Sequence, residues 1–202
     1  MEYLIFIALG YLLGSVPFGL ITGRLAKGID IRSHGSGSTG MTNVWRTVGV
    51  PAAIIVLVLD MAKSILAVVI AMIFSGVPTI EMAAALSVLA GHNWPIFSRF
   101  RGGKGIASGW AGLFVLSPVA GLIGGVVGIS TIAIWRYASL GSLLGTASGA
   151  ASLIILVVLD YSPTVYSLYS TVAVPLIVFR HRDNIARLVK GKERKLERHV
   201  KA

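Results

Sequence analysis

Residues 91–107 read GHNWPIFSRFRGGKGIA, a polar stretch between two apolar runs. It holds a histidine, three cations (Arg99, Arg101 and Lys104) and a Gly-Gly-Lys-Gly turn at 102–105. Glycines let successive backbone N–H groups point into one concavity, and an ammonium group beside them favours an anion. The turn therefore predicts a site for an anionic oxygen, most simply a phosphate. A loop whose cations only set membrane topology would explain the arginines but not the glycine-lysine turn.

The rest of the chain has the composition of an integral membrane protein. Of 202 residues, 55% are hydrophobic and only 13% are charged, and the mean hydropathy is +0.82. Soluble domains carry about 25% charged residues. Cysteine is absent, which excludes disulfides, thiolate catalysis and cysteine-based metal sites. We do not interpret the first apolar run as a signal peptide, because no Lys or Arg precedes it and no small-residue cleavage site follows it.

The apolar residues form seven segments, and a membrane-spanning helix needs about 20 residues, with a range near 17–25. Five segments approach or reach that length, whereas the third and fourth look short. Short segments beside a polar loop are a pointer to a binding site in membrane proteins. The segments are 4–25, 51–74, 80–90, 106–116, 119–135, 140–159 and 165–179.

The positions of Lys and Arg determine how these segments cross the membrane. Basic residues follow the first, third, fifth and seventh segments, whereas the connections after the second, fourth and sixth contain none. The positive-inside rule then predicts an all-α protein with seven transmembrane helices, the N-terminus outside and the C-terminus in the cytoplasm. We expect one polytopic domain, 1–202, with cytoplasmic loops at about 26–50, 91–105 and 136–140 and a basic tail at 180–202. For this count the chain must turn at Ser117-Pro118.

One basic residue breaks the pattern: Lys63 lies within the second segment, three residues after Asp60. At that spacing the two side chains share a helix face and can form an ion pair. An ionisable pair inside a membrane suggests function. We favour a structural salt bridge, although the pair is also the best support for a transporter.

The first cytoplasmic loop contains GSGSTG at 35–40, which matches the glycine spacing of a dinucleotide-binding motif. That motif requires a preceding strand, and here a transmembrane helix precedes it, so we reject a dinucleotide site. What remains is a glycine-rich loop with hydroxyl, amide and guanidinium groups that can bind phosphate. A flexible polar loop is the alternative.

The tail holds nine of the eighteen Lys and Arg residues. Most of them suit a membrane surface with anionic lipids, at about 1 kcal/mol each. His181 and Asn184 come directly after the last apolar segment, level with the other polar loops. Ser142, at the start of the sixth segment, caps a helix unless it faces the same pocket. The sequence contains no nucleic-acid-reading module, so we expect no nucleic-acid partner.

Together the loops place two histidines, several cations and two glycine-rich turns on one face. No carboxylate is among the leading candidates, which argues against a magnesium-dependent kinase site. A cytoplasmic site rich in anion-binding groups suits an enzyme that joins a lipid-soluble acyl chain to a phosphorylated acceptor. A transporter of organic phosphates or other anions is the competing hypothesis.

Three motifs carry a resemblance over essentially the whole chain: GSGSTGMTN followed by Arg46 and Gly49, GHNWPIFSRFRGGKGIA, and RHRDNIARLVKGKE from Arg180. They resemble the cytoplasmic motifs of the bacterial acyl-phosphate:glycerol-3-phosphate acyltransferases. Ser38 departs from the asparagine usual in that family. The resemblance implies transfer of an acyl group from acyl phosphate to the 1-hydroxyl of glycerol 3-phosphate, the first step of phospholipid synthesis. It also implies a bacterial inner-membrane enzyme that needs no cofactor and no metal, and we expect a monomer.

The resemblance also implies roles for individual residues. His92 and His181 are the candidate proton acceptors, and a substrate phosphate is the alternative. The acyl chain is expected in an apolar groove between helices, open to the bilayer. The glycerol-3-phosphate site would comprise Arg46, Gly102, Gly103, Lys104, Gly105, Ser142, His181 and Asn184. The acyl-phosphate site would comprise Ser36, Gly37, Thr42, Asn43 and His92.

Overall fold

The structure, a computed structural model, describes residues 2–196, and this part of the chain is helical without strands. The all-α prediction is therefore confirmed, whereas the last part of the predicted tail, 197–202, lies outside the described residues. Three short 3-10 turns, η1 (Ile31–Ser33), η2 (Ile96–Ser98) and η3 (Thr164–Tyr166), interrupt the connections. The α-helices are α1 (Glu2–Gly14), α2 (Phe18–Lys27), α3 (Met41–Thr47), α4 (Val50–Ser75), α5 (Pro78–Asn93), α6 (Ile106–Leu116), α7 (Pro118–Trp135), α8 (Ala138–Val158), α9 (Ser167–Arg180) and α10 (Arg182–Val189).

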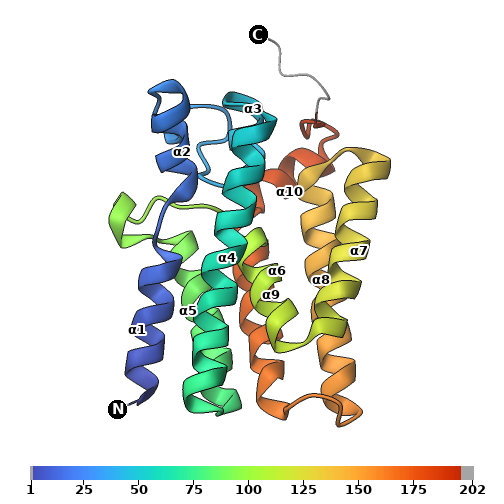
Figure 1. Cartoon of the computed structure of the whole chain (residues 1–202). Coiled ribbons are helices and arrows are strands. Elements are labelled where there is room, and N and C mark those ends of the chain that lie inside the picture. The colour runs from blue at the N-terminus through green and yellow to red at the C-terminus, as the bar shows by residue number, and fades with distance from the viewer. Residues whose placement is uncertain (1, 197–202) are drawn as a thin grey trace.

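The helices form an upright bundle (Figure 1). Helices α1, α4 and α5 lie on one side, α7 and α8 lie on the other, and α6 and α9 lie between them. The start of α1 and the short helices α3 and α10 lie at opposite ends of the bundle. Three polar loops and the start of the tail are thereby gathered at the end that carries α3 and α10.

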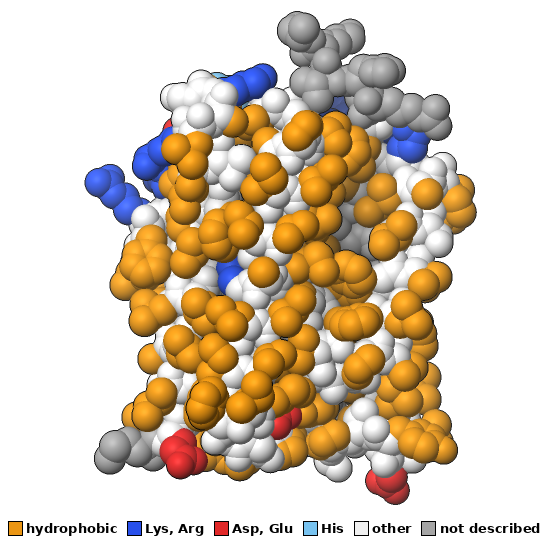
Figure 2. All heavy atoms as spheres, in the orientation of Figure 1, with side chains coloured by type: hydrophobic (Ala, Val, Ile, Leu, Met, Phe, Trp, Pro, Cys, Tyr) orange, Lys and Arg blue, Asp and Glu red, His pale blue; other side chains and the backbone are white. Residues whose placement is uncertain are grey.

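Four helical stretches are long and apolar enough to cross a membrane: Glu2–Lys27, α4, α7 and α8. On the face shown in Figure 2, hydrophobic side chains cover most of the length of the bundle. Lys and Arg side chains gather toward the end with α3 and α10, whereas acidic side chains mark the opposite end. These features are typical of a multi-pass membrane protein.

The first apolar segment is not one continuous helix. It divides into α1 and α2 at Ser15-Val16-Pro17. Proline has no backbone N–H to donate and disfavours helical backbone in the residue before it, so the helix stops there. The carbonyl of Val16 accepts a hydrogen bond from the side chain of Lys63 instead, at 3.1 Å.

The other boundaries agree closely with the apolar segments. Helix α6 covers the predicted 106–116, and the chain turns between Leu116 and Pro118 as predicted. Helix α5 (Pro78–Asn93) begins two residues before the predicted segment 80–90 and ends three residues after it, so its last turn includes His92 and Asn93. His92 is therefore a helix residue packed inside the bundle, not part of a loop.

Candidate active site

The glycine turn at 102–105 packs against the end of α5. The N–H of Gly103 donates to the carbonyl of His92 at 3.0 Å. A Cβ atom at Gly103 would overlap Nε2 of His92, and one at Gly102 would overlap the His92 carbonyl. Gly105, the residue before α6, has a φ of 81°, in the left-handed region that favours glycine. The turn needs its glycines because the backbone lies directly on His92.

Arg180, at the end of α9, fastens this turn from the other side. Its Nε and Nη2 donate to the carbonyl of Gly103 at 3.0 and 2.7 Å, and Nη2 also reaches the carbonyl of Gly102 at 3.3 Å. These carbonyls face the guanidinium, so the turn is held in one conformation by a residue 77 positions later in the chain.

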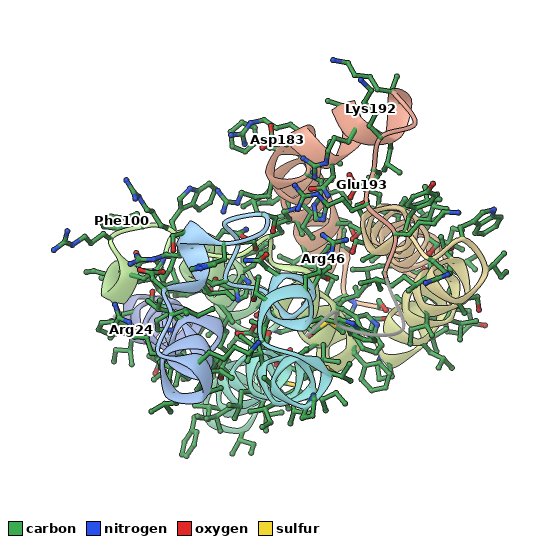
Figure 3. The ribbon with its side chains drawn as sticks, turned by 90° about the horizontal axis from the view of Figure 1, so that it is seen from above. Arg24, Arg46, Phe100, Asp183, Lys192 and Glu193 are labelled. Atoms are coloured by element: carbon green, nitrogen blue, oxygen red, sulfur yellow. The ribbon has the colours of Figure 1, made fainter. Side chains whose placement is uncertain are left out.

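Lys104 belongs to a polar cluster at the same end of the bundle. Its ammonium donates to Oδ1 of Asn184, whose Nδ2 donates to Oε1 of Glu193 at 2.7 Å. Ser139 donates to the same oxygen at 2.9 Å, and Nε of Arg187 donates to Oε2 at 2.8 Å. Figure 3 shows Glu193 and Arg46 toward the middle of this end, whereas Lys192 lies at its rim. Arg46 donates to the carbonyl of Arg194 at 3.0 Å, so the tail crosses the cluster.

The charges of the cluster alter the protonation of its members. Burial and the charge of Arg187 lower the pKa of Lys104 to about 8. Burial alone would raise the pKa of the Glu193 carboxyl, but hydrogen bonds from Asn184, Arg187 and Ser139 outweigh it and leave the pKa below its ordinary value. The carboxylate of Glu193 thus lies in the same cluster as Lys104, the residue predicted to bind phosphate.

His181 lies between α9 and α10 and is buried. Its Nδ1 is 2.8 Å from the carbonyl of Ile177, and since a carbonyl only accepts, Nδ1 carries the proton. Nε2 therefore keeps its lone pair. Burial lowers the pKa of His181 to about 4, with the charge of Lys104 acting in the same direction. The side chain is a neutral hydrogen-bond acceptor and a weak base.

His92 lies deeper, in a buried ionic group with Asp60 and Lys63 of α4. Lys63 Nζ and Asp60 Oδ1 form the predicted ion pair at 2.7 Å. Nδ1 of His92 is 3.1 Å from Lys63 Nζ and 3.4 Å from Asp60 Oδ1. Ser108 of α6 is also 3.4 Å from Nδ1. The pair that we interpreted as a structural salt bridge is thus in direct contact with a candidate site residue.

The first loop is organised around Asn43, which is buried on α3. Its Oδ1 accepts from the backbone N–H of Ser36 at 2.8 Å, and its Nδ2 donates to the carbonyls of Ile31, His34 and Ser38. Its polar atoms are thereby occupied within the loop, so Asn43 shapes the loop. Ser36 and Gly37 are exposed, Thr42 is half-buried, and a further residue of this loop, Thr39, lines a small cavity with Lys63 and His92.

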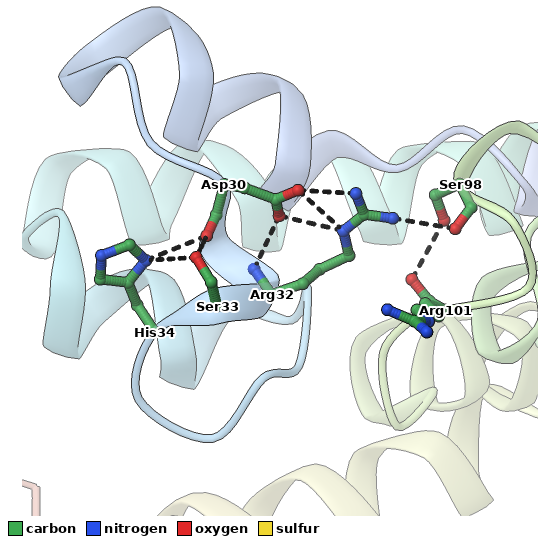
Figure 4. Close-up of polar contacts among 6 residues, drawn as sticks. All are labelled: Asp30, Arg32, Ser33, His34, Ser98 and Arg101. Carbon is green, nitrogen blue, oxygen red and sulfur yellow. Dashed lines mark hydrogen bonds and ion pairs between the residues drawn. The ribbon is translucent and has the colours of Figure 1, made fainter.

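An arginine joins the first loop to the second (Figure 4). Arg32 pairs with Asp30 at 2.6 Å and donates through Nη1 to the carbonyl of Ser98 at 3.0 Å. Ser98 in turn donates to the carbonyl of Arg101 at 3.0 Å. The loop that carries Asn43 and the loop that carries the glycine turn are therefore fixed to each other.

An apolar groove begins below the polar cluster. Helices α6, α7, α8 and α9 line it, with three glycines of α7 on its wall: Gly124, Gly125 and Gly128. Its lining includes Ile106, which follows Gly105, and Ile177, whose carbonyl holds His181. Ser142 also lines the groove and donates to the carbonyl of Ala138 at 2.7 Å. Ser139, the second residue of α8, is the serine that joins the polar cluster, through its hydrogen bond to Glu193.

Several residues of this region were not among the predicted site residues. No carboxylate was among the predicted site residues, yet Asp60 contacts His92 and Glu193 accepts a hydrogen bond from Asn184. Arg180 and Ser139 were also missed. The Asp60–Lys63 spacing was the available signal for the first contact, whereas nothing local in the sequence distinguishes Glu193 from the charges around it.

Comparison with known proteins adds a consistent set of matches. The family model described as glycerol-3-phosphate acyltransferase matches residues 4–191. The chain is 42% identical to glycerol-3-phosphate acyltransferase 3 of Dehalococcoides mccartyi, with 96% of each chain covered. It is 44% identical to glycerol-3-phosphate acyltransferase of Desulforamulus reducens, with 92% of this chain and 91% of that one covered.

Solved structures are similar over nearly the whole chain. The crystal structure of PlsY (YgiH), an integral membrane glycerol 3-phosphate acyltransferase, in its glycerol 3-phosphate form has a TM-score of 0.89 and 35% identity, and covers 98% of this chain and 96% of that one. The lysophosphatidic acid form of that protein has a TM-score of 0.86 and 34% identity, with the same coverage.

Proposed function

Because this chain belongs to the glycerol-3-phosphate acyltransferase family, we propose that it moves a fatty acyl group from an acyl phosphate to the 1-hydroxyl of glycerol 3-phosphate. The chain is an acyltransferase of phospholipid biosynthesis, and its family membership does not favour the anion-transporter alternative. The products are lysophosphatidic acid and inorganic phosphate. The new elements of the proposal are the acyl-phosphate donor, the site residues and the membrane orientation.

One observation carries the proposal: a cluster suited to phosphate adjoins the mouth of an apolar groove. Lys104 and Asn184 belong to the cluster. Two residues of the groove lie close to it: Ile106 follows Lys104 by two positions, and the carbonyl of Ile177 binds the ring of His181. Glycerol 3-phosphate needs an anion site, and a fatty chain needs an apolar one. An enzyme that joins the two substrates must hold their reacting atoms about 3–3.5 Å apart, so the two sites must adjoin.

Within this proposal the acceptor's phosphate binds Lys104 and the glycine turn, with Arg46, His181 and Asn184 around it. Ser142 lies at the groove and would contact the glycerol side of the product. On the donor side, Ser36, Gly37 and Thr42 offer N–H and hydroxyl groups to the acyl phosphate, and Asn43 holds their loop in shape. His92 is the donor-side group nearest the reacting carbonyl.

The reaction forms a bond between the acceptor hydroxyl oxygen and the carbonyl carbon. The bond from that carbon to the phosphate oxygen breaks, and the hydroxyl proton leaves to a base. Nε2 of His181 can accept a hydrogen bond from the hydroxyl, but a pKa of about 4 makes it a poor base. A phosphate dianion, with a second pKa of about 6, is the better proton acceptor. The mixed anhydride is already activated, so positioning supplies much of the rate.

We further propose seven membrane crossings, with the site at the cytoplasmic face of a bacterial inner membrane. The basic end of the bundle and the acidic opposite end follow the positive-inside rule. The shorter α5, α6 and α9 pack beside the four long helical stretches.

The test uses the purified chain in detergent, with palmitoyl phosphate and glycerol 3-phosphate. We expect phosphate release that requires both substrates and equals the lysophosphatidic acid formed. Palmitoyl-CoA in place of palmitoyl phosphate is the control for the donor and should give no product. Release that requires a sealed vesicle and a gradient would support transport and overturn the proposal.

A further inference from the structure

The buried ammonium of Lys63 has a complete set of hydrogen-bond acceptors. It contacts Oδ1 of Asp60 at 2.7 Å, the carbonyl of Val16 at 3.1 Å and Nδ1 of His92 at 3.1 Å. An ammonium group has three N–H donors and no lone pair, so three acceptors use all of its hydrogens. Val16 can take part because the break before Pro17 frees its carbonyl from helix bonding.

This arrangement fixes where the proton of His92 sits. The ammonium of Lys63, 3.1 Å from Nδ1, can only donate, so this contact requires a lone pair on Nδ1. The carboxylate of Asp60 is the competing partner for Nδ1, but at 3.4 Å it lies beyond the usual length of an N–H···O hydrogen bond, so the closer contact decides. The hydroxyl proton of Ser108 is directed to the carbonyl of Asp60 at 3.0 Å, so this serine does not compete for Nδ1 as a donor. A neutral imidazole with a lone pair on Nδ1 carries its proton on Nε2.

The Nε2 atom points at the glycine turn. A Cβ atom at Gly103 would overlap this nitrogen, so the ring edge lies directly beneath the turn. His181, by contrast, has its proton on Nδ1 and a lone pair on Nε2. The two histidines therefore offer opposite groups to the site, a donor from His92 and an acceptor from His181.

We propose that Asp60 and Lys63 are positioning residues that hold His92 as a neutral Nε2–H donor. His92 then stabilises the negative charge that develops on an oxygen of the acyl phosphate, and it does not take up the hydroxyl proton. The inference rests on the proposed function and replaces the general-base role first considered for His92. The charged groups acting on His92 are Asp60 and Lys63 of α4 and Arg180 of α9.

The first experiment reads the tautomer of His92 directly and does not depend on activity. In ¹⁵N-histidine-labelled wild-type protein in detergent, the resonance of His92, assigned by its loss in His92→Gln, should show a protonated Nε2 and an unprotonated Nδ1. Lys63→Met removes the donor and keeps the shape of the side chain, so Nδ1 should become protonated toward Asp60. A proton on Nδ1 in the wild-type protein would overturn the inference whether or not the enzyme is active.

The second experiment asks whether His92 donates or accepts. Glutamine places an amide N–H near the position of Nε2 but cannot take up a proton. His92→Gln should therefore keep kcat within about tenfold of wild type, whereas His92→Ala and His92→Asn should lose about 10²- to 10³-fold, the usual effect of removing an oxyanion donor. Between pH 5 and 8, wild type and His92→Gln should show the same dependence of kcat on pH.

A loss in His92→Gln as large as that in His92→Ala, with the melting temperature unchanged, would show that His92 acts as a base. The proposed function is judged separately, by wild-type phosphate release in the same assay. A wild-type enzyme that is active with palmitoyl phosphate, together with an inactive His92→Gln, refutes only the donor role.

Discussion

Replacing Lys104 with methionine should weaken the binding of glycerol 3-phosphate far more than it slows turnover. The ammonium lies at the glycine turn, hydrogen-bonded to Asn184 and within the field of Glu193 and Arg187. A charge-assisted hydrogen bond is worth about 1.5–3 kcal/mol, and about 1.4 kcal/mol corresponds to a factor of ten. The KM for glycerol 3-phosphate should therefore rise about 10- to 150-fold. The acceptor's phosphate does not react, so the contact stabilises ground and transition states alike and kcat should change little.

Phosphate release measured over a range of glycerol 3-phosphate concentrations, at saturating palmitoyl phosphate, separates the two constants. Lys192→Met is the matched control, because Lys192 is exposed at the rim of the same end of the bundle. A fall in kcat without a change in KM, or equal effects in the two variants, would refute the assignment of Lys104 to the acceptor's phosphate.

The pH dependence of the same constant provides a second readout. Lys104 carries its charge below a pKa of about 8 and loses it as the pH rises through that value. The KM for glycerol 3-phosphate should therefore rise about tenfold for each pH unit above 8, the slope expected when one proton is required for binding, until it reaches the KM of Lys104→Met. Lys104→Arg stays charged throughout, so its KM should be flat over this range. An equal rise in the arginine variant would assign the effect to another group.

Three further substitutions test other parts of the site. Gly103→Ala puts a methyl group onto Nε2 of His92, an overlap that costs about 1–3 kcal/mol of folding stability. The melting temperature in detergent should therefore fall, and kcat/KM in the release assay should fall as His92 is displaced; wild-type values of both would refute the packing described. Ala150→Phe fills the far part of the groove, so the preference should shift from palmitoyl to shorter acyl phosphates while the KM for glycerol 3-phosphate stays unchanged. The control is Ala147→Phe, at an exposed position of the same helix, which should leave the chain-length preference unchanged. Glu193→Ala leaves three donors without their acceptor, which should lower the free energy of unfolding by about 1–3 kcal/mol. Thermal unfolding in detergent should therefore occur at a lower temperature, and Glu193→Gln should be closer to wild type. An unchanged midpoint in the alanine variant would contradict this.

The fold was largely predictable because the membrane simplifies the problem. Apolar runs mark helices, and charged connections mark one face, so the segments at 51–74, 106–116 and 119–135 agree with α4, α6 and α7 within a residue or two. The break at Val16-Pro17 was missed, although a proline within an apolar run is a signal for it. The short helices α3 and α10 were harder to predict, because their stability comes from packing on the bundle more than from their own seven or eight residues.

The site was predictable where a motif is local and unpredictable where contacts are distant. The glycine-lysine turn lies within four residues, and its need for small residues is visible in the sequence. Glu193 reaches Ser139 across 54 positions, and Arg180 reaches Gly103 across 77. A basic tail with many similar charges does not reveal which carboxylate or guanidinium is turned inward. Only the packing of α9 and α10 against the glycine turn decides that.

The histidines show the same limit at the level of a single proton. From the sequence, His92 and His181 are equivalent candidates for a base, since both have an ordinary pKa near 6.5. In the bundle, the carbonyl of Ile177 fixes one tautomer of His181, whereas the ammonium of Lys63 fixes the other tautomer of His92. The carbonyl of Val16 helps to hold this ammonium, and it is available because the chain breaks between α1 and α2 at Pro17. A helix break thus contributes to the chemistry of a residue 76 positions later, since it helps to hold the lysine that decides what His92 can donate.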